Sequence, residues 1–237
     1  MKPSKLLFYD RQQAGQILAQ QLDGYRGKPG LLVLALPRGG VSLGFEVARA
    51  LKAPLDVFIV RKLGFPGNDE YAMGAIASGG VRVMNPVVHN LVTPTEIQQV
   101  VDREKTELVR RQNFYRHNRP PAPINGRTVI VVDDGLATGS TMKAALIAIR
   151  QQHPMGLIAA VPVGESESCA ALAAYADEVV CVASPEPFGG VGCWYSEFPQ
   201  ASDDEVCRLL EAARRELAAG GDLTGDADTS GRLTAEH

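Results

Sequence analysis

Two adjacent carboxylates, Asp133 and Asp134, are the residues in this sequence whose types and spacing most clearly predict chemistry. They follow the apolar, β-branched run of residues 129–132, which is typical of a buried parallel strand. Ligands of open α/β sheets bind beyond the carboxyl ends of such strands, so we expect the pair at the mouth of a crevice. Neighbouring carboxylates can accept hydrogen bonds from a vicinal diol, such as that of a ribose.

The turn after the carboxylates has the composition of a phosphate site. It leads into the helix-like run of residues 142–150, and a helix N-terminus attracts anions. The small and hydroxyl-bearing residues that could surround a phosphate are Ala137, Thr138, Gly139, Ser140 and Thr141. The alternative is an ordinary turn in which Asp134 or Thr138 caps the helix, but a cap accounts for only one polar residue. The whole stretch therefore favours a ribose 5-phosphate ligand.

A second strand, turn and helix repeats this arrangement earlier in the chain. Residues 31–36 predict a strand and residues 41–51 a helix, and the turn between them contains Arg38, Gly39 and Gly40. Most glycine-rich turns are only turns, so this one is weak evidence by itself. Arg38 adds a fork of donors suited to phosphate oxygens, and the turn should face the same crevice.

A basic pair, Arg61 and Lys62, follows the next predicted core strand, residues 55–60. The ordinary interpretation of such a pair is a solvated strand end, but its position at the crevice favours an anion site. The Gly-, Pro- and Asn-containing residues 63–71 then predict a mobile loop. Residues 72–84 predict a hairpin with its turn at two glycines.

Aromatic residues gather after the last predicted core strand, residues 178–183. Phe188, Trp194 and Tyr195 would lie near the carboxyl end of that strand, where aromatic rings can stack on a flat heterocycle. The alternative, a small hydrophobic cap over the domain, explains the same residues equally well.

The remaining elements alternate between strands and helices. Helical patterns cover residues 8–23, capped by Asp10, residues 94–117, and a final helix that Ser202 caps. The arginines of the long second helix are expected on a solvated face, with a dimer contact or a basic rim as alternatives; they include Arg103, Arg110, Arg111 and Arg116. The alternation predicts an α/β fold with a mostly parallel central sheet between helices. Residues 1–219 should form one domain and residues 220–237 a polar, weakly ordered tail.

Composition excludes several classes of protein. A net charge of −3 over 237 residues argues against a nucleic-acid or membrane surface. No apolar run is long enough to span a bilayer, and the N-terminus becomes polar too early for a signal peptide. The four cysteines show no CxxC spacing and are expected as small apolar fillers in a reducing cytoplasm; they are Cys169, Cys181, Cys193 and Cys207.

The stretch VIVVDDGLATGST resembles the PRPP-binding motif of the type I phosphoribosyltransferases, with Gly135 where that family more often has an apolar residue. The resemblance implies that the acidic pair binds the ribose hydroxyls and that residues 137–141 bind the 5-phosphate. It places the turn of Arg38, Gly39 and Gly40 at the family's pyrophosphate loop, where an unusual cis peptide is expected. It also places Arg61 and Lys62 beside a flexible loop. We expect a small cap or hood subdomain built from the chain ends.

The stretch FGGVGCWYSE is similar to the base-binding segment of purine phosphoribosyltransferases. Phe188 matches the aromatic residue that stacks on the base, with Trp194 and Tyr195 as further candidates. The resemblance implies Mg²⁺, for which Asp133, Asp134 and the nearest downstream carboxylate, Glu197, are the candidate ligands. The implied activity is transfer of a phosphoribosyl group from PRPP to a nitrogen acceptor, in a protein that could be a homodimer. A non-catalytic sensor of PRPP or nucleotides is the alternative, and the acceptor stays open.

Overall fold

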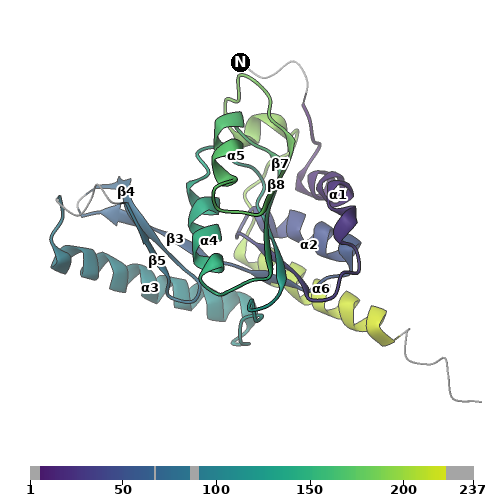
Figure 1. The fold of residues 1–237 in the computed structure, drawn as a ribbon, viewed down its shortest axis with the longest axis horizontal. Helices are drawn as coiled ribbons and strands as arrows, with labels where there is room; N and C mark the ends of the chain where they lie inside the picture. Colours follow the sequence, from purple (N-terminus) through teal and green to yellow (C-terminus); the bar gives the residue numbers. More distant parts are fainter. Residues whose placement is uncertain (1–5, 67, 86–90, 223–237) are drawn as a thin grey trace, which may run out of the picture.

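The centre of the protein is a parallel five-stranded sheet in the order β2-β1-β6-β7-β8 (Figure 1). The structure is a computed structural model that describes residues 6–66, 68–85 and 91–222. The strands of this sheet are β1 (Leu31–Ala35), β2 (Leu55–Val57), β6 (Thr128–Val132), β7 (Gly156–Val163) and β8 (Glu178–Ala183). The predicted α/β fold with a parallel central sheet flanked by helices is confirmed.

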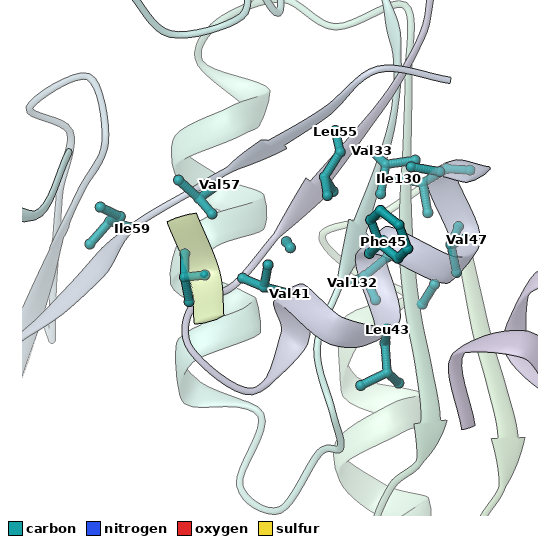
Figure 2. Packing of buried hydrophobic residues seen from close by; sticks show 14 of the residues in the cluster. Val33, Val41, Leu43, Phe45, Val47, Leu55, Val57, Ile59, Ile130 and Val132 are labelled. Atoms are coloured by element: carbon teal, nitrogen blue, oxygen red, sulfur yellow. The ribbon is translucent and has the colours of Figure 1, made fainter. Parts of the chain in front are cut away.

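Helices cover both faces of this sheet (Figure 1). One face carries α1 (Arg11–Gln21) and α2 (Gly40–Leu51), and the other carries α4 (Ser140–Arg150) and α5 (Ser166–Leu172). Successive residues of a strand point to opposite faces, so alternate residues of β1 enter two different hydrophobic cores. Figure 2 shows the core on the α2 side, where Val33, Ile130 and Val132 of the sheet meet Val41 and Phe45 of the helix. These cores hold the ends of β1 and β6 in fixed positions.

A second, smaller sheet lies beside the first and is antiparallel, in the order β3-β4-β5 (Figure 1). Its strands are β3 (Val60–Phe65), β4 (Asn68–Ala77) and β5 (Arg82–Met84), and the long helix α3 (Pro94–Arg116) packs on it. Leu63, Met73 and Ile76 are almost completely buried there. Apolar burial under α3 thus stabilises this second sheet.

The sequence interpretation of this region is wrong in two respects. The predicted core strand of residues 55–60 ends at Val57, and β3 begins at Val60, so Arg61 and Lys62 lie on the second sheet. Of residues 63–71, predicted as a mobile loop, residues 63–65 belong to β3 and residues 68–71 belong to β4, with register shifts on either side of Gly64. Antiparallel pairing gives the backbone groups of this segment partners that sequence composition does not reveal. The predicted turn at the two glycines between β4 and β5 is confirmed.

The helix starts follow the predicted capping residues. Asp10 accepts a hydrogen bond from the N–H of Gln13 at the start of α1, and Thr93 forms a capping box at the start of α3. Ser202 accepts from the N–H of Glu205 at the start of α6 (Asp203–Asp222), which continues past the predicted boundary at residue 219. The rest of the predicted tail lies outside the described residues. No described helix has both the length and the apolar character that a membrane span needs.

Arg116 departs from the prediction that the arginines of α3 are solvated. It is 5% exposed, and its Nε lies 2.8 Å from Oδ1 of Asp56 on β2. Its Nη2 donates to the carbonyl of Val57 at 2.6 Å, and Asp56 also accepts from the N–H of Ala122 at 2.9 Å. A charge buried this deeply needs such partners, and the pair fixes the end of α3 against the edge of the central sheet.

Cys169 on α5 and Cys181 on β8 lie side by side, although their spacing in sequence fits no motif. Both are free thiols, and their sulfur atoms are 3.1 Å apart. The hydrogen bond that Cys169 donates lowers the pKa of Cys181 to about 6. The fold thus brings together two thiols that the sequence predicts only as small apolar fillers.

Alkylation of Cys181 by iodoacetamide is therefore expected to stay fast down to about pH 6, because the thiolate is the nucleophile. Replacing Cys169 by Ala removes the donor and should shift the midpoint of the pH profile upward. Peptide mass spectrometry after timed labelling measures the rate at Cys181 alone. Identical profiles for the wild type and the Cys169→Ala variant would contradict this account of the pair.

Candidate active site at the carboxyl end of β6

Two loops meet beyond the carboxyl ends of the adjacent strands β1 and β6. Asp133 and Asp134 follow Val132, the last residue of β6. The turn after β1 is tied to them because Leu36 donates its N–H to the carbonyl of Val132 at 2.9 Å. The two strand–turn–helix segments recognised in the sequence therefore border one another, as the position of ligand sites in α/β sheets leads us to expect.

The turn after β1 approaches the acidic pair so closely that only glycine fits. A Cβ atom on Gly39 would lie 2.0 Å from Oδ2 of Asp134, and one on Gly40 would lie 2.6 Å from the carbonyl oxygen of Val132. The peptide bond between Pro37 and Arg38 is cis, as the family resemblance leads us to expect. The backbone of this turn and the carboxylates thus form one continuous surface.

Arg11 pairs with Asp134, a contact that no pattern in the sequence predicts. Its Nε and Nη2 atoms each lie 2.8 Å from Oδ2 of Asp134. Burial raises the pKa of Asp133 well above its usual range, and the charge of Asp134 raises it further. Burial also raises the pKa of Asp134, while the charge of Arg11 opposes that rise. The pair is thus a site of concentrated negative charge that one cation partly balances.

The residues predicted to bind a phosphate form the turn into α4. Gly139 has a positive φ of 68° directly before the helix, a conformation in which glycine has no steric penalty. The side chains of Thr138, Ser140 and Thr141 are exposed, and the hydroxyls of Thr138 and Ser140 are 3.1 Å apart. The first N–H groups of α4 have no carbonyl one turn before them, so this end of the helix can receive an anion.

A cavity of about 710 Å³ separates the start of α4 from the second sheet. Thr138, Ser140 and Thr141 line it on one side, together with Lys143, and Lys62 lines it on the other. This volume is within the usual range of small-molecule sites. Asp133 and Asp134 do not line it. Lys62 and three hydroxyls make its polar wall suitable for an anionic ligand, while the ammonium of Lys143 lies 4.7 Å from the centre of the Tyr175 ring.

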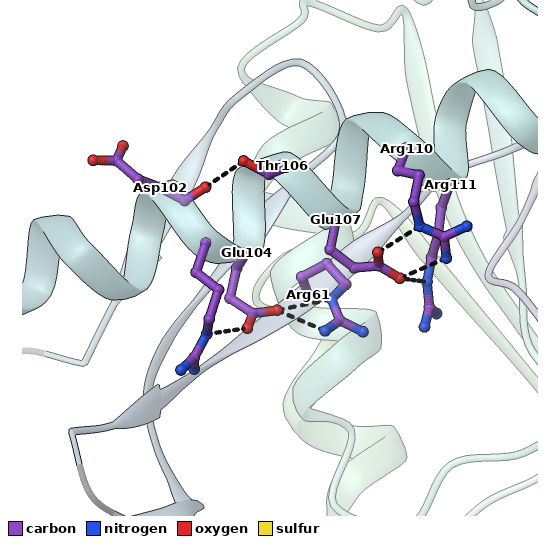
Figure 3. Close-up of polar contacts among 8 residues, drawn as sticks. Arg61, Asp102, Glu104, Thr106, Glu107, Arg110 and Arg111 are labelled. Carbon is purple, nitrogen blue, oxygen red and sulfur yellow. Dashed lines mark hydrogen bonds and ion pairs between the residues drawn. The ribbon is translucent and has the colours of Figure 1, made fainter.

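The predicted cations Arg38 and Arg61 both have acidic neighbours. Arg61 donates from Nε and Nη2 to Glu104 of α3, at 2.9 and 2.6 Å, as Figure 3 shows. Arg38 is only partly exposed, and its Nη1 lies 4.0 Å from Oδ1 of Asp203 at the start of α6. Lys62 is the member of this predicted set that lines the cavity.

The aromatic residues after β8 occupy unequal positions. Trp194, at the end of η3 (Val191–Trp194), is 7% exposed and donates from its indole to the carbonyl of Phe188 at 2.8 Å. Tyr195 is 4% exposed, and its hydroxyl donates to the carbonyl of Asp134 at 2.6 Å. Because both rings are packed in the core, the structure leaves Phe188, which is half-buried, as the ring best able to meet a ligand.

Glu197 does not join the acidic pair. It accepts a hydrogen bond from the hydroxyl of Tyr9 at 2.7 Å and lines a separate cavity of about 330 Å³ with Asp10 and Arg11. Among the residues that the structure describes, no group of three His, Cys, Asp or Glu side chains is arranged to hold a metal ion. The three carboxylates predicted as metal ligands therefore do not form one preassembled site.

Comparisons with known proteins identify a family for this chain. The family model described as "Phosphoribosyl transferase domain" matches residues 9–195. A Mycobacterium tuberculosis H37Rv protein, provisionally named a phosphoribosyl transferase, is 46% identical over 224 residues, which are 94% of this chain and 50% of that protein. The crystal structure of TT1426 from Thermus thermophilus is similar with a TM-score of 0.76 and 41% identity, over 86% of this chain and 97% of that one. The chain spans about half the length of these curated Mycobacterium relatives.

Proposed function

Because the chain belongs to the phosphoribosyl transferase family, we propose that it transfers the 5-phosphoribosyl group of PRPP to a nitrogen acceptor and releases pyrophosphate. The observation that carries this proposal is the position of Asp133 and Asp134 between the end of β6 and the hydroxyl-rich start of α4. A ribose bound by the carboxylates would extend its 5-phosphate toward that helix start.

In the proposed complex, Asp133 and Asp134 accept hydrogen bonds from the ribose hydroxyls. The backbone N–H groups and hydroxyls of residues 137–141 bind the 5-phosphate, and Lys143 would add a positive charge by leaving the ring of Tyr175. Binding at both ends fixes the sugar, so the anomeric carbon is held in one place for the incoming acceptor.

Pyrophosphate is the leaving group, and its developing charge needs donors. The backbone of Gly39 and Gly40 can approach it closely, and Arg38 and Lys62 can donate to its oxygens. Arg61 would have to exchange Glu104 for the pyrophosphate, since it pairs with that carboxylate here. We assign these residues one main catalytic contribution: they stabilise the leaving group while the ribose ring gains positive charge.

Mg²⁺ is the cofactor that we propose, since it would neutralise the phosphates of PRPP. The residues fit this ion in part. Asp133 is a buried carboxylate beside a second negative charge, so an approaching cation would relieve their repulsion. Glu197 lies in another cavity and is left out of the proposed set. One or two carboxylates are enough when the substrate supplies its own phosphate oxygens, so Asp133 and Asp134 suffice.

The acceptor would bind near Phe188, with one face of its ring against the aromatic side chain. Trp194 and Tyr195 would support this surface without touching the acceptor. Trp194 donates to the carbonyl of Phe188, and Tyr195 donates to the carbonyl of Asp134. A nucleobase is the flat nitrogenous acceptor that such a surface would recognise.

Replacing Gly39 by Ala should weaken PRPP binding about 10-fold, because the displaced Asp134 carboxylate keeps only part of its hydrogen bonding. The added methyl group would lie 2.0 Å from Oδ2 of Asp134, so that carboxylate must move. The matched control is Gly24→Ala, since no atom lies within 4 Å of a Cβ there. Calorimetric titration of both variants measures the effect, and equal affinities would contradict the proposed arrangement.

A non-catalytic sensor of PRPP or nucleotides is the second candidate. Two observations favour it: Glu104 holds Arg61, and a hairpin occupies most of the segment predicted as a mobile loop. A sensor needs the ribose and phosphate sites but no route for pyrophosphate to leave.

The test of the proposed function is pyrophosphate release from PRPP with Mg²⁺ across a panel of nucleobases and related amines. A matched reaction without an acceptor measures hydrolysis alone. Release that depends on one acceptor would establish the transferase and identify its substrate. Saturable PRPP binding without release from any acceptor would instead favour the sensor.

A further inference from the structure

Arg11, the first residue of α1, reaches a carboxylate 123 residues away in sequence. Its Nε and Nη2 atoms both lie 2.8 Å from the same oxygen of Asp134, Oδ2. We propose that Arg11 is a positioning residue for the ribose site, which fixes the orientation of the Asp134 carboxylate. The inference rests on the proposed function, since it concerns how the acidic pair would recognise the sugar.

The guanidinium of Arg11 is itself held from two further directions. Its Nη1 donates to the carbonyl of Pro199 at 2.5 Å, and its central carbon lies 3.7 Å from the centre of the Phe198 ring. The side chain of Arg11 is 12% exposed and that of Asp134 is 17% exposed. A planar guanidinium with these contacts has little freedom, so it holds the carboxylate far more firmly than a solvated surface pair would.

The backbone of Asp134 is fixed by the same neighbouring segment. The hydroxyl of Tyr195 donates to the carbonyl of Asp134 at 2.6 Å, and the rings of Tyr195 and Phe198 are in contact, with centroids 4.8 Å apart. The N–H of Phe8 in turn donates to the carbonyl of Trp194 at 3.1 Å, which ties the start of the chain to this segment. Residues 8–11 and residues 194–199 therefore hold both the backbone and the side chain of Asp134.

This arrangement predicts which part of a ligand depends on Arg11. Both contacts use Oδ2 of Asp134, so Arg11 leaves Oδ1 for a ligand hydroxyl. Asp133 is also oriented, because its Oδ1 accepts the N–H of Asp134 at 2.9 Å. Two carboxylates in fixed orientations can engage both hydroxyls of a ribose, whereas a deoxy sugar offers only one. Selectivity for the diol should thus depend on Arg11.

The experiment compares ribose 5-phosphate with 2-deoxyribose 5-phosphate by calorimetric titration. Arg11→Gln should lose about 10-fold in affinity for ribose 5-phosphate, by analogy with the loss seen when a residue that orients a metal ligand is removed. We assign Asp134 to the 2-hydroxyl, which the deoxy sugar lacks, so the affinity of the variant for the deoxy sugar should change little and the selectivity ratio falls. Arg11→Lys keeps the charge without the fork and should recover part of the ratio. Arg26→Gln, which breaks the exposed Arg26–Asp23 pair, is the matched control and should keep the wild-type ratio.

An unchanged ratio in the Arg11→Gln protein would overturn the inference. Equal losses for both sugars would overturn it as well, because they would indicate a structural role without any effect on the diol. If the Arg11→Gln protein shows no cooperative unfolding, and so is not properly folded, the selectivity ratio of the Arg11→Lys variant decides the question. A wild-type protein that binds neither sugar phosphate nor PRPP is a separate result, which refutes the proposed function itself.

Discussion

Replacing Asp134 by Asn is expected to weaken PRPP binding about 100-fold while the protein stays folded. Asn has nearly the shape of Asp but no charge, so a ribose hydroxyl loses a charge-assisted hydrogen bond. Arg11 can still donate to the amide oxygen, and Tyr195 still donates to the backbone carbonyl, so the local structure should persist. Calorimetric titration with PRPP measures the loss, and circular dichroism confirms the fold.

Asp177→Asn provides the control for this variant. Asp177 is a carboxylate outside the site that pairs with Arg150 on α4 and is more than half exposed. Its replacement should leave PRPP affinity within about twofold, since exposed ion pairs contribute little. An Asp134→Asn protein that binds PRPP as tightly as this control would refute the assignment of Asp134 to the ribose.

Replacing Arg116 by Met is expected to lower the free energy of unfolding by about 3–5 kcal/mol, the usual cost of leaving one member of a buried ion pair unpartnered. Asp56 would keep its hydrogen bond from Ala122 but lose the charge that balances it. Because the pair joins α3 to the edge of the central sheet, the whole domain should become less stable. Urea unfolding followed by circular dichroism measures the change.

A double variant tests whether the unpaired charge of Asp56 causes the loss of stability. Adding Asp56→Asn to Arg116→Met removes the uncompensated carboxylate, so part of the lost stability should return. Arg110→Met, which breaks an exposed pair with Glu107 on the same helix (Figure 3), should cost at most about 1 kcal/mol. A double variant no more stable than Arg116→Met alone would show that lost packing, and not the charge, sets the cost.

The sequence predicts the central sheet and its helices because local signals agree there with the fold. The apolar run before Asp133 forms a strand, and Asp10, Thr93 and Ser202 cap the expected helices. The adjacency of the acidic pair and the turn at Gly39 follows from parallel strand order, which places both at one edge of the sheet. These features depend on short-range patterns that a single chain reveals.

Contacts between distant segments are what the sequence cannot show. Arg11 meets Asp134 only because α1 packs next to residues 194–199, and no spacing rule joins them. The sequence predicts Arg116 as a solvated cation, but the end of α3 packs against β2 and buries it beside Asp56. Cys169 and Cys181 likewise become neighbours only through the packing of α5 on β8. The sequence does not predict the β3–β4 hairpin for another reason. Its glycines are typical of a loop, whereas its strands depend on burial under α3.

The central claim is that the acidic pair binds the ribose of PRPP. The most direct measurement is calorimetric titration of PRPP with Mg²⁺ into the wild-type protein and into the Asp133→Asn/Asp134→Asn double variant. We predict saturable binding at one site in the wild type, competition by ribose 5-phosphate, and loss of binding in the folded double variant. Absence of binding in the wild type, or equal binding in both proteins, would contradict the account.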